Sequence, residues 1–275
     1  MNPGHDKSLA LAARDLLTFY VESGADAVLG EEPVNRFAEA SVVESVEAKS
    51  TVEPLSPARD VRSAPPMPAV QAPPPPDEAI TAAGAAARSA GSLEELRAIM
   101  ESFTGCALRT TAKQLVFGDG SPDARLMFVG QAPGSEEDQK GIPFVSRSGQ
   151  LLDRMLGAIG FARSDVYIAN MVPWRPPGNR DPSPQESQIC LPFIKRQIEL
   201  VDPDVIVCLG KPPTATLLGV TEGIRRARGR WLTYDTGTRE IRATATFHPD
   251  YLLSTPIEKR FAWRDFLAIR KALQQ

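Results

Sequence analysis

Three stretches of this sequence carry residues that could act on a bound ligand. The first is the glycine-rich loop 130–141, which follows the apolar run 126–129 and contains several carboxylates. Glycines at the end of a strand let backbone N–H groups approach a ligand closely. The other two stretches contain Asn170, near the end of the apolar run 166–172, and His248, which follows the apolar run 242–247 and is one of only two histidines in the chain. An amide and an imidazole at the ends of strands predict a site that holds a polar ligand by hydrogen bonds.

The alternation of apolar strands with amphipathic helices predicts the frame that holds these residues. The expected strands cover residues 125–129, 166–172, 205–209 and 242–247. The expected helices cover residues 148–159, 184–200, 212–218 and 256–273. Strands separated by helices pair in parallel through right-handed crossovers. The expected fold class is therefore α/β, a three-layer α/β/α sandwich around a central, mainly parallel four-stranded sheet, with an extra hairpin at residues 229–245.

Two helix starts carry capping signals. Ser92 is followed three residues later by Glu95, and Ser183 is followed by Pro184 and Glu186. Both patterns predict a capping box, in which the serine and the glutamate side chains bind each other's backbone N–H groups.

The N-terminal part of the chain has a different composition. Residues 8–21 place apolar side chains at helical spacing, so an amphipathic helix is expected within residues 1–30. Residues 31–78 are rich in Pro, Ala and Glu and are expected to form a disordered linker. The catalytic domain is therefore expected to cover residues 79–275. The helix or the proline-rich linker could bind a protein partner, although a spacer role for the linker is favoured.

The charge is distributed unevenly along the chain. Residues 1–100 carry 8 Lys/Arg against 15 Asp/Glu, a net charge of −7, whereas residues 101–275 carry 23 against 19, a net charge of +4. A basic catalytic part favours a polyanionic substrate.

The three cysteines, Cys106, Cys190 and Cys208, are too few and too scattered for a disulfide framework. This pattern fits a reducing compartment. The sequence contains no apolar run long enough to cross a bilayer and no export signal is apparent at its start. A cytoplasmic, monomeric protein without a membrane partner is expected.

Four motifs together resemble the uracil-DNA glycosylases, specifically the family 4 group. They are GQAPGSEED, PFVSRSGQLLD, IANMVPWRPPGNRDPSP and FHPDYLL, and they occur in this order between residue 103 and the C-terminus. The resemblance implies an enzyme that removes uracil from DNA by hydrolysing the N-glycosidic bond and leaves an abasic site. Such an enzyme belongs to base-excision repair, and uracil-containing DNA is its substrate.

The resemblance also implies roles for individual residues. Phe144 matches the aromatic residue that stacks on the flipped base, and Asn170 matches the amide that reads uracil. An amide can accept from uracil N3–H while it donates to O4, and cytosine presents the opposite pattern. His248 is implied to donate to uracil O2, and backbone N–H groups at Gly130 and Gln131 are expected to assist.

The group that activates water is less clear from the motifs. Ala132 occupies the position at which other uracil glycosylase families place an aspartate. Glu137 matches a carboxylate of the family's loop, so the resemblance implies that it orients or deprotonates the water, with Asp138 as the alternative. Gln131 stands where the family has a glutamate, so it removes a charge near the base and could donate where the glutamate accepts.

DNA contact requires cations and an apolar wedge. Arg175 and Arg180 flank the loop after the second strand, and a further cluster of arginines comprises Arg225, Arg226, Arg228 and Arg230. These side chains are expected to bind phosphates. Leu252 is expected to enter the space left by the flipped base, with Tyr251 and Leu253 as alternatives.

The cysteines depart from the family pattern. Most family 4 members hold a four-iron, four-sulfur cluster with four cysteines, and here Cys106 and Cys190 match two of those positions. Phe103 and Trp174 occupy the other two. Two thiolates cannot hold such a cluster, so no metal cofactor is expected and both aromatic residues should pack in the vacated space.

Two alternatives remain open. The base removed could be another deaminated base such as hypoxanthine, which Gln131 could admit. The protein could instead be a non-catalytic DNA-binding or partner-recruiting module, although Asn170 and His248 argue against this. No lysine occupies a motif position, so a monofunctional enzyme that does not nick the strand is expected.

Overall fold

The computed structural model describes residues 75–274, except for the side chain of Pro76. The predicted N-terminal helix, His5 and residues 31–74 of the predicted linker lie outside the described residues. The first described helix begins at Pro76, close to the domain boundary expected near residue 79. Within residues 75–274, no helix is both long enough and apolar enough to cross a membrane.

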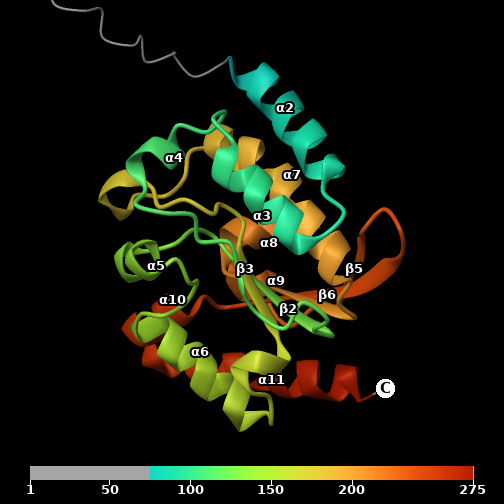
Figure 1. Ribbon diagram of the computed structural model, residues 1–275. Coiled ribbons are helices and arrows are strands. Elements are labelled where there is room, and N and C mark those ends of the chain that lie inside the picture. The colour runs from blue at the N-terminus through green and yellow to red at the C-terminus, as the bar shows by residue number, and fades with distance from the viewer. Residues whose placement is uncertain (1–74, 275) are drawn as a thin grey trace, which may run out of the picture. The chain divides into compact units, whose positions relative to one another are not determined.

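A six-stranded sheet forms the centre of this part of the chain (Figure 1). Its strands are β1 (Asp119–Gly120), β2 (Leu126–Gly130), β3 (Tyr167–Asn170), β4 (Val205–Leu209), β5 (Leu232–Asp235) and β6 (Glu240–Thr246). The strand order is β1-β3-β2-β4-β6-β5, in which the four inner strands run parallel and the two edge strands are antiparallel to their neighbours. The predicted hairpin is confirmed as β5 and β6. The expected count of four strands is wrong, because β5 joins the sheet and the two-residue strand β1 is too short to show a periodic pattern.

Helices connect the strands and cover the sheet. The α-helices are α2 (Pro76–Ser89), α3 (Leu93–Ser102), α4 (Leu108–Thr111), α5 (Ser135–Lys140), α6 (Arg147–Ala158), α7 (Pro184–Val201), α8 (Lys211–Leu218), α9 (Ile224–Ala227), α10 (Pro249–Ser254) and α11 (Lys259–Leu273). Three 3-10 turns lie at η2 (Arg163–Asp165), η3 (Pro177–Asn179) and η4 (Pro256–Glu258). The sequence prediction missed α2, in an alanine-rich stretch, and the short helices α4, α5, α9 and α10.

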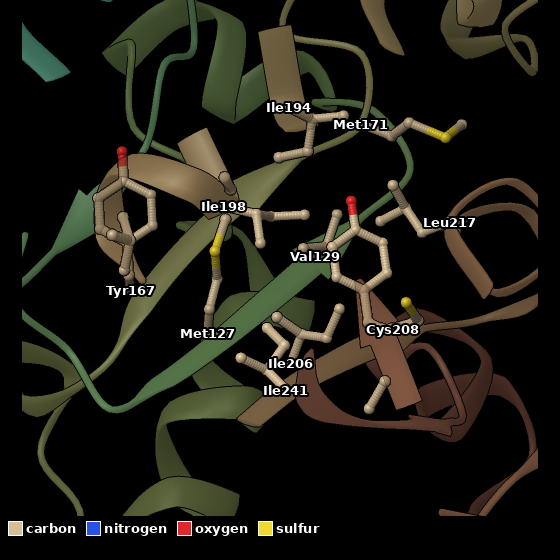
Figure 2. Packing of buried hydrophobic residues seen from close by; sticks show 14 of the residues in the cluster. Met127, Val129, Tyr167, Met171, Ile194, Ile198, Ile206, Cys208, Leu217 and Ile241 are labelled. Carbon is tan, nitrogen blue, oxygen red and sulfur yellow. The ribbon is translucent and has the colours of Figure 1, made fainter. Parts of the chain in front are cut away.

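Each face of the sheet packs against a different set of helices, as expected for a three-layer sandwich. On one face, Met127 and Ile206 pack against Ile194 and Ile198 of α7 and Leu217 of α8 (Figure 2). The alternating residues of the same strands point to the other face. There Leu126, Phe128, Val205 and Val207 pack against residues of α6 and α11. A further apolar cluster joins α2 and α3 to α7.

The two capping boxes form to different extents. Ser183 and Glu186 bind each other's backbone N–H groups, so the box at the start of α7 is complete. Ser92 accepts from the Glu95 N–H, but Glu95 accepts from the N–H of Gly91 rather than from that of Ser92. The start of α3 is therefore capped by a variant of the predicted box.

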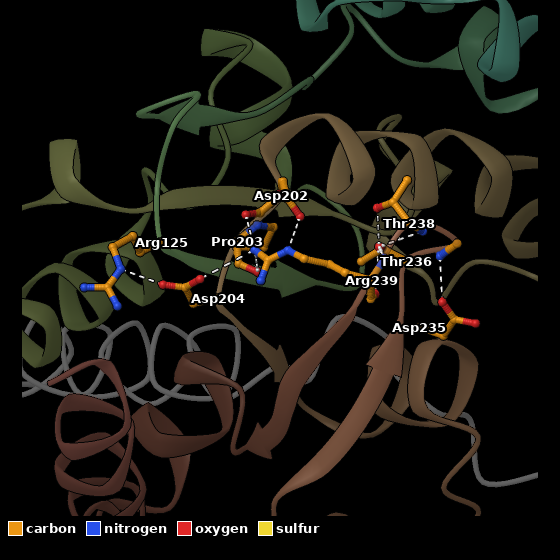
Figure 3. Close-up of polar contacts among 9 residues, drawn as sticks. Arg125, Asp202, Pro203, Asp204, Asp235, Thr236, Thr238 and Arg239 are labelled. Atoms are coloured by element: carbon orange, nitrogen blue, oxygen red, sulfur yellow. Dashed lines mark hydrogen bonds and ion pairs between the residues drawn. The ribbon is translucent and has the colours of Figure 1, made fainter. Parts of the chain in front are cut away.

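An ionic network lies at the amino ends of the parallel strands (Figure 3). Arg239, just before β6, donates to Asp202 Oδ1 at 2.6 Å and to its carbonyl oxygen at 2.7 Å. Arg125, just before β2, donates to Asp204 Oδ2 at 2.5 Å. These contacts join β2, β4 and the β5–β6 hairpin at the edge opposite the candidate site.

Candidate functional site

The parallel register brings the ends of the strands together. Gly130 pairs with Asn170 across β2 and β3, and Leu209 pairs with Thr246 across β4 and β6. His248 follows Thr246 by two residues. The loops that start from these strand ends therefore meet at one edge of the sheet. In open α/β sheets, ligands bind at this edge, where the carboxyl ends of the strands lie.

A cavity of about 470 Å³ lies at this edge. Of the predicted uracil-binding and catalytic residues, five line it: Gln131, Glu137, Phe144, Asn170 and His248. Further lining residues come from the same loops and include Gly134, Ser146, Ser148, Asn179, Arg180, Asp181 and Asp250. The tertiary structure thus gathers side chains that are more than 110 positions apart in the sequence.

Gly130 makes room for two of these side chains. A Cβ atom at this position would lie 2.4 Å from Asn170 Oδ1 and 2.6 Å from the Phe144 ring. Any larger residue would therefore push the aromatic ring and the amide apart. Gly130 therefore affects the cavity through its contacts with Phe144 and Asn170, although it is not one of the residues that line the cavity.

Phe144 is held in a backbone conformation that few residues other than glycine adopt. Its φ is 52°, and its side chain is buried. A Cβ at Gly149 would lie 1.8 Å from the Phe144 carbonyl oxygen, so α6 can approach this backbone only because residue 149 is glycine. Arg163 donates to the carbonyl oxygens of Pro143 at 2.5 Å and Phe144 at 3.1 Å.

Arg163 is itself held by two carboxylates. Its guanidinium pairs with Asp119 of β1 at 2.5 Å and with Asp153 of α6 at 3.0 Å. The short edge strand β1 therefore acts on the cavity through Arg163 and the Phe144 backbone. The sequence analysis missed Arg163, because nothing in its local sequence relates it to a loop twenty residues earlier.

Asn170 has a buried acceptor that is not satisfied. Its side chain is 4% exposed, and Oδ1 has no hydrogen-bond partner among residues 75–274. Leaving such an atom unpaired costs about 1–3 kcal/mol. A ligand with an N–H group at this end of the cavity would satisfy it.

His248 is the N-cap of α10, and its hydrogen bond defines its tautomer. Its Nδ1 accepts from the Asp250 N–H at 3.2 Å. Burial lowers the pKa of His248, and the charges of Asp250 and Glu137 offset this only in part, so the pKa lies below its ordinary value of 6.5. The ring is therefore neutral at pH 7, with its proton on Nε2. The imidazole lies beside Phe144, with ring centroids 5.5 Å apart.

Glu137 lies in α5, with its carboxylate buried against the Phe144 loop. Oε1 accepts from the N–H groups of Val145 and Ser146, both at 3.0 Å. Burial raises the pKa of Glu137, but hydrogen bonds from the Ser146 hydroxyl and from backbone N–H groups outweigh burial, so the pKa lies below its ordinary value. A carboxylate used in this way organises the loop and is a weak base.

Asp138 does not line the cavity. Its buried carboxylate accepts from the Lys113 N–H at 2.8 Å and lies 3.8 Å from Arg175. The expectation that Asp138 could replace Glu137 in handling water is therefore wrong, because successive residues of a helix point to different sides.

The predicted DNA-binding arginines fall into two groups. Arg180 lines the cavity and is paired with Glu186 at 2.7 Å. Arg175 donates to Asn179 Oδ1 at 2.7 Å. Arg226 is exposed. Arg228 differs, because its half-buried guanidinium makes an ion pair with the buried carboxylate of Asp265 and donates to the Phe261 carbonyl oxygen at 2.6 Å. The donors of Arg228 are used inside the fold in this structure, and its binding to phosphate stays a prediction.

Leu252, the expected wedge, is buried in this structure. It is 0% exposed and packs with Phe247 and Ala262. Its insertion into DNA would require it to leave this packing, and the role stays a prediction. The neighbouring Tyr251 and Leu253 are partly exposed.

The cysteines that match the family's cluster ligands lie in an apolar cluster. Cys190 Sγ and Cys106 Sγ are 4.0 Å apart, and the hydrogen bond between them, together with burial, raises the pKa of Cys190. Trp174 is buried beside them, and Phe103 packs edge to face on Phe193 with centroids 5.0 Å apart. Among residues 75–274, no three His, Cys, Asp or Glu side chains converge as metal ligands would. Two sulfurs among aromatic side chains do not fit a four-iron, four-sulfur cluster.

Asp181 is a further lining residue that the sequence analysis missed. Its Oδ1 accepts from the Gln131 Nε2 at 3.0 Å, so it joins the loop after β3 to the loop after β2. The residue lies inside one of the family motifs, but its partner fifty positions away is visible only in the structure.

Comparison with known proteins agrees with this geometry. The family model of the uracil DNA glycosylase superfamily matches residues 117–267, which is more than half of the chain. A type-4 uracil-DNA glycosylase of Thermotoga maritima is 42% identical over 165 residues, which cover 58% of this chain and 84% of that protein. Type-4 uracil-DNA glycosylases of Archaeoglobus fulgidus and Saccharolobus solfataricus are each 38% identical and are covered over 85% and 80% of their lengths, with 60% and 61% of this chain. The chain therefore belongs to the uracil DNA glycosylase superfamily.

Proposed function

We propose that this protein is a monofunctional uracil-DNA glycosylase, which hydrolyses the bond between uracil N1 and deoxyribose C1′ and leaves an abasic site for base-excision repair. The observation that carries the proposal is the unsatisfied Oδ1 of Asn170, which is buried in a cavity at the strand ends. Membership of the superfamily and the type-4 relatives support the same activity.

Asn170 is proposed to read the base. Its Oδ1 accepts from uracil N3–H, and its Nδ2 donates to O4. Cytosine carries an acceptor at N3 and a donor at the exocyclic amine, so each amide atom would face a group of its own kind. Losing one such partner costs about 1–3 kcal/mol, which favours uracil over cytosine by about 5- to 150-fold for each lost contact.

Phe144 is proposed to stack on the flipped base. A base that is removed from the duplex loses its stacking partners, and an aromatic face in the cavity replaces them. The support for this role is the position of Phe144 beside both Asn170 and His248.

His248 is proposed to stabilise the leaving group. When the glycosidic bond breaks, its electron pair passes to uracil N1, and the negative charge spreads to O2. A neutral imidazole with its proton on Nε2 can donate to O2, and the N–H groups of Gly130 and Gln131 are proposed to assist. The water oxygen then bonds to C1′, and the proton that the water releases passes through solvent to the uracil anion, so neutral uracil and an abasic site are the products. Glu137 is proposed to hold the Phe144 loop and to add negative charge beside the sugar cation.

Arg175, Arg180 and Arg226 are proposed to bind DNA phosphates. Arg180 lines the cavity, and Arg226 is exposed on α9. Each phosphate contact displaces a counterion, so affinity should fall as the salt concentration rises.

A gel assay tests the activity. Single- and double-stranded oligonucleotides that contain uracil, cytosine or hypoxanthine are treated with the protein, and abasic sites are revealed by alkali. We expect alkali-labile sites at uracil only, and no strand break before alkali, since no lysine among residues 75–274 lines the cavity. A variant with both Asn170→Ala and His248→Ala should be inactive, whereas Asp123→Asn, on an exposed loop residue, is the control. Full activity of the double variant would contradict the site assignment, and binding of uracil DNA without turnover would contradict an enzymatic function.

We further propose that the protein works without an iron–sulfur cluster. The support is the donor set, in which Phe103 and Trp174 replace two of four thiolates and pack into the apolar cluster. Protein purified without oxygen should contain no stoichiometric iron and should keep full activity. Iron at about four atoms per chain with a brown absorbance would overturn the proposal.

A further inference from the structure

A hydrogen bond between Gln131 and Asp181 joins two loops that line the cavity. Gln131 directly follows β2, and Asp181 lies in the loop between β3 and α7. Gln131 Nε2 donates to Asp181 Oδ1 at 3.0 Å, and both residues line the cavity.

This contact defines the orientation of the Gln131 amide group. A carboxylate can only accept hydrogen bonds, so the amide must turn its NH₂ group toward Asp181. Oε1 is then on the side away from Asp181, and it accepts no hydrogen bond from residues 75–274. The chemistry of the Asp181 carboxylate therefore determines the orientation of the Gln131 amide. Asp181 uses one of the two N–H groups on Nε2, and the other remains available as a donor, so the expectation that Gln131 donates to the base stays a prediction.

Asp181 is held in turn by the start of α7. Its carbonyl oxygen accepts from Arg180 Nη1 at 2.9 Å, and the guanidinium of Arg180 binds both oxygens of Glu186 at 2.8 and 2.7 Å. Glu186 also completes the capping box with Ser183. The loop that carries Asp181 is thus tied to a rigid helix of 18 residues.

The contacts of Glu137 suggest that a different group accepts a hydrogen bond from the attacking water. Its Oε1 is occupied by two backbone N–H groups, and its hydrogen bonds make it a weak base. Attack on a sugar that already carries positive charge needs an oriented water more than a strongly basic one. A neutral carbonyl oxygen can orient water by accepting one of its hydrogens.

We propose that Asp181 is a positioning residue that turns the Gln131 amide so that its carbonyl oxygen accepts from the attacking water. The inference rests on the proposed glycosylase function, because the water is the co-substrate of that reaction. Gln131 in this role offers the cavity an acceptor, as a carboxylate would, but without a second negative charge beside Asp181.

Four variants test the inference, with kcat and KM measured by single- and multiple-turnover assays between pH 5 and 9. In Asp181→Asn, the asparagine side chain can both donate and accept, so the Gln131 amide can adopt either orientation. The value of kcat should therefore fall about tenfold at unchanged KM. Gln131→Glu places two carboxylates in hydrogen-bonding range, which raises the pKa of one of them and should introduce a new ionisation into the pH profile. The double variant Gln131→Glu with Asp181→Asn restores a donor opposite an acceptor, so it should regain most of the wild-type kcat and lose the new ionisation. Asp123→Asn controls for the change in net charge.

A second measurement does not depend on turnover. In the Gln131→Glu variant, the titration of the introduced carboxyl group is followed by ¹³C NMR, with and without Asp181→Asn. A raised pKa that returns to normal in the double variant supports the contact even if the wild-type protein removes no base. In that case the proposed function fails, and so does the role of Gln131 in water attack. The orientation of the Gln131 amide still stands.

Two results would overturn the inference. One is an unchanged kcat in Asp181→Asn together with a Gln131→Glu variant whose pH profile matches the wild type. The other is a change confined to KM, which would make Asp181 a group that tunes DNA binding. Thermal unfolding of each variant establishes that it is folded before its kinetics are interpreted.

Discussion

Individual residues at the cavity show a conflict between stability and binding. Asn170 Oδ1 is buried without a partner, and Phe144 has a positive φ. Both features cost free energy in the unliganded protein. Such costs are retained where a ligand or a reaction repays them, so they mark the site as strongly as the motif does.

The first prediction concerns Asn170. Asn170→Ala should lower kcat/KM on uracil DNA by about 30- to 1000-fold, because two hydrogen bonds to the base, together worth about 2–4 kcal/mol, are lost. The same variant should not lower the free energy of unfolding, because it removes a buried acceptor that is unsatisfied. Urea denaturation and single-turnover kinetics measure the two effects. A less stable variant with unchanged kinetics would show that Asn170 is structural.

The second prediction concerns the pH dependence of His248. Its pKa lies below 6.5, so activity should be constant from pH 8 down to about 6.5 and should fall at lower pH, where Nδ1 gains a proton and loses its bond to the Asp250 N–H. His248→Asn should remove this acidic limb from the rate profile.

The stability of the folded protein should also decrease at acidic pH because of His248. The unfolded chain binds the proton of His248 more tightly than the folded protein, so this residue's contribution to stability is complete above pH 6.5 and is lost as the pH falls through the folded pKa. A wild-type rate that rises as the pH falls from 6.5 would contradict a neutral imidazole.

At the scale of elements, the cavity depends on parts that carry no catalytic side chain. The edge strand β1 contributes Asp119, and α6 contributes Asp153, and both hold Arg163 against the Phe144 loop. α7 holds Arg180 through Glu186. The positions of the site residues are therefore set by elements on both faces of the sheet.

The third prediction tests this support. Arg163→Ala leaves the carbonyl oxygens of Pro143 and Phe144 without their donor, so it should cost about 2–3 kcal/mol of unfolding free energy. It should also raise KM and lower kcat, because Phe144 is no longer held. Arg97→Ala is the matched control: its pair with Glu101 is exposed and should be worth less than about 1 kcal/mol. Equal stabilities of the two variants would show that Arg163 does not hold the loop.

At the scale of the whole molecule, α2 and α3 extend the sandwich on the outer side of α7. Ala79, Ala83 and Ala87 of α2 are buried, and Arg196 of α7 donates to the Ala90 carbonyl oxygen at 2.8 Å. α2 is therefore part of the folded domain.

The fourth prediction compares two truncations. A protein that begins at residue 75 should keep the glycosylase activity on oligonucleotides, since every residue that lines the cavity is retained. A protein that begins at residue 92 lacks α2 and should lose about 2 kcal/mol of stability, because three buried methyl groups contribute roughly 0.8 kcal/mol each. Thermal unfolding and the gel assay separate the two. Loss of activity in the protein that begins at residue 75 would assign residues 1–74 a role in catalysis.

The sequence by itself determined the order of strands and helices and most of the cavity. The apolar runs have strand length, and the capping residues at Ser92 and Ser183 mark helix starts, because these signals are local in the chain. The motifs that contain Asn170 and His248 are local too, and parallel pairing brings their strand ends to one edge of the sheet. The two-residue strand β1 and the short helices α4, α5, α9 and α10 were missed, since a period cannot be read from so few residues.

Only the tertiary structure decided what each polar side chain does. The sequence places Arg226 and Arg228 in one basic cluster, but only the fold brings Asp265 to Arg228 from 37 positions away. The fold also buries Leu252. It places Glu137 in the lining of the cavity but not Asp138, although the two residues are adjacent in the sequence. Hydrogen bonds and burial depend on neighbours that are distant in the chain, as the contact between Gln131 and Asp181 does, so the local sequence carries no record of them.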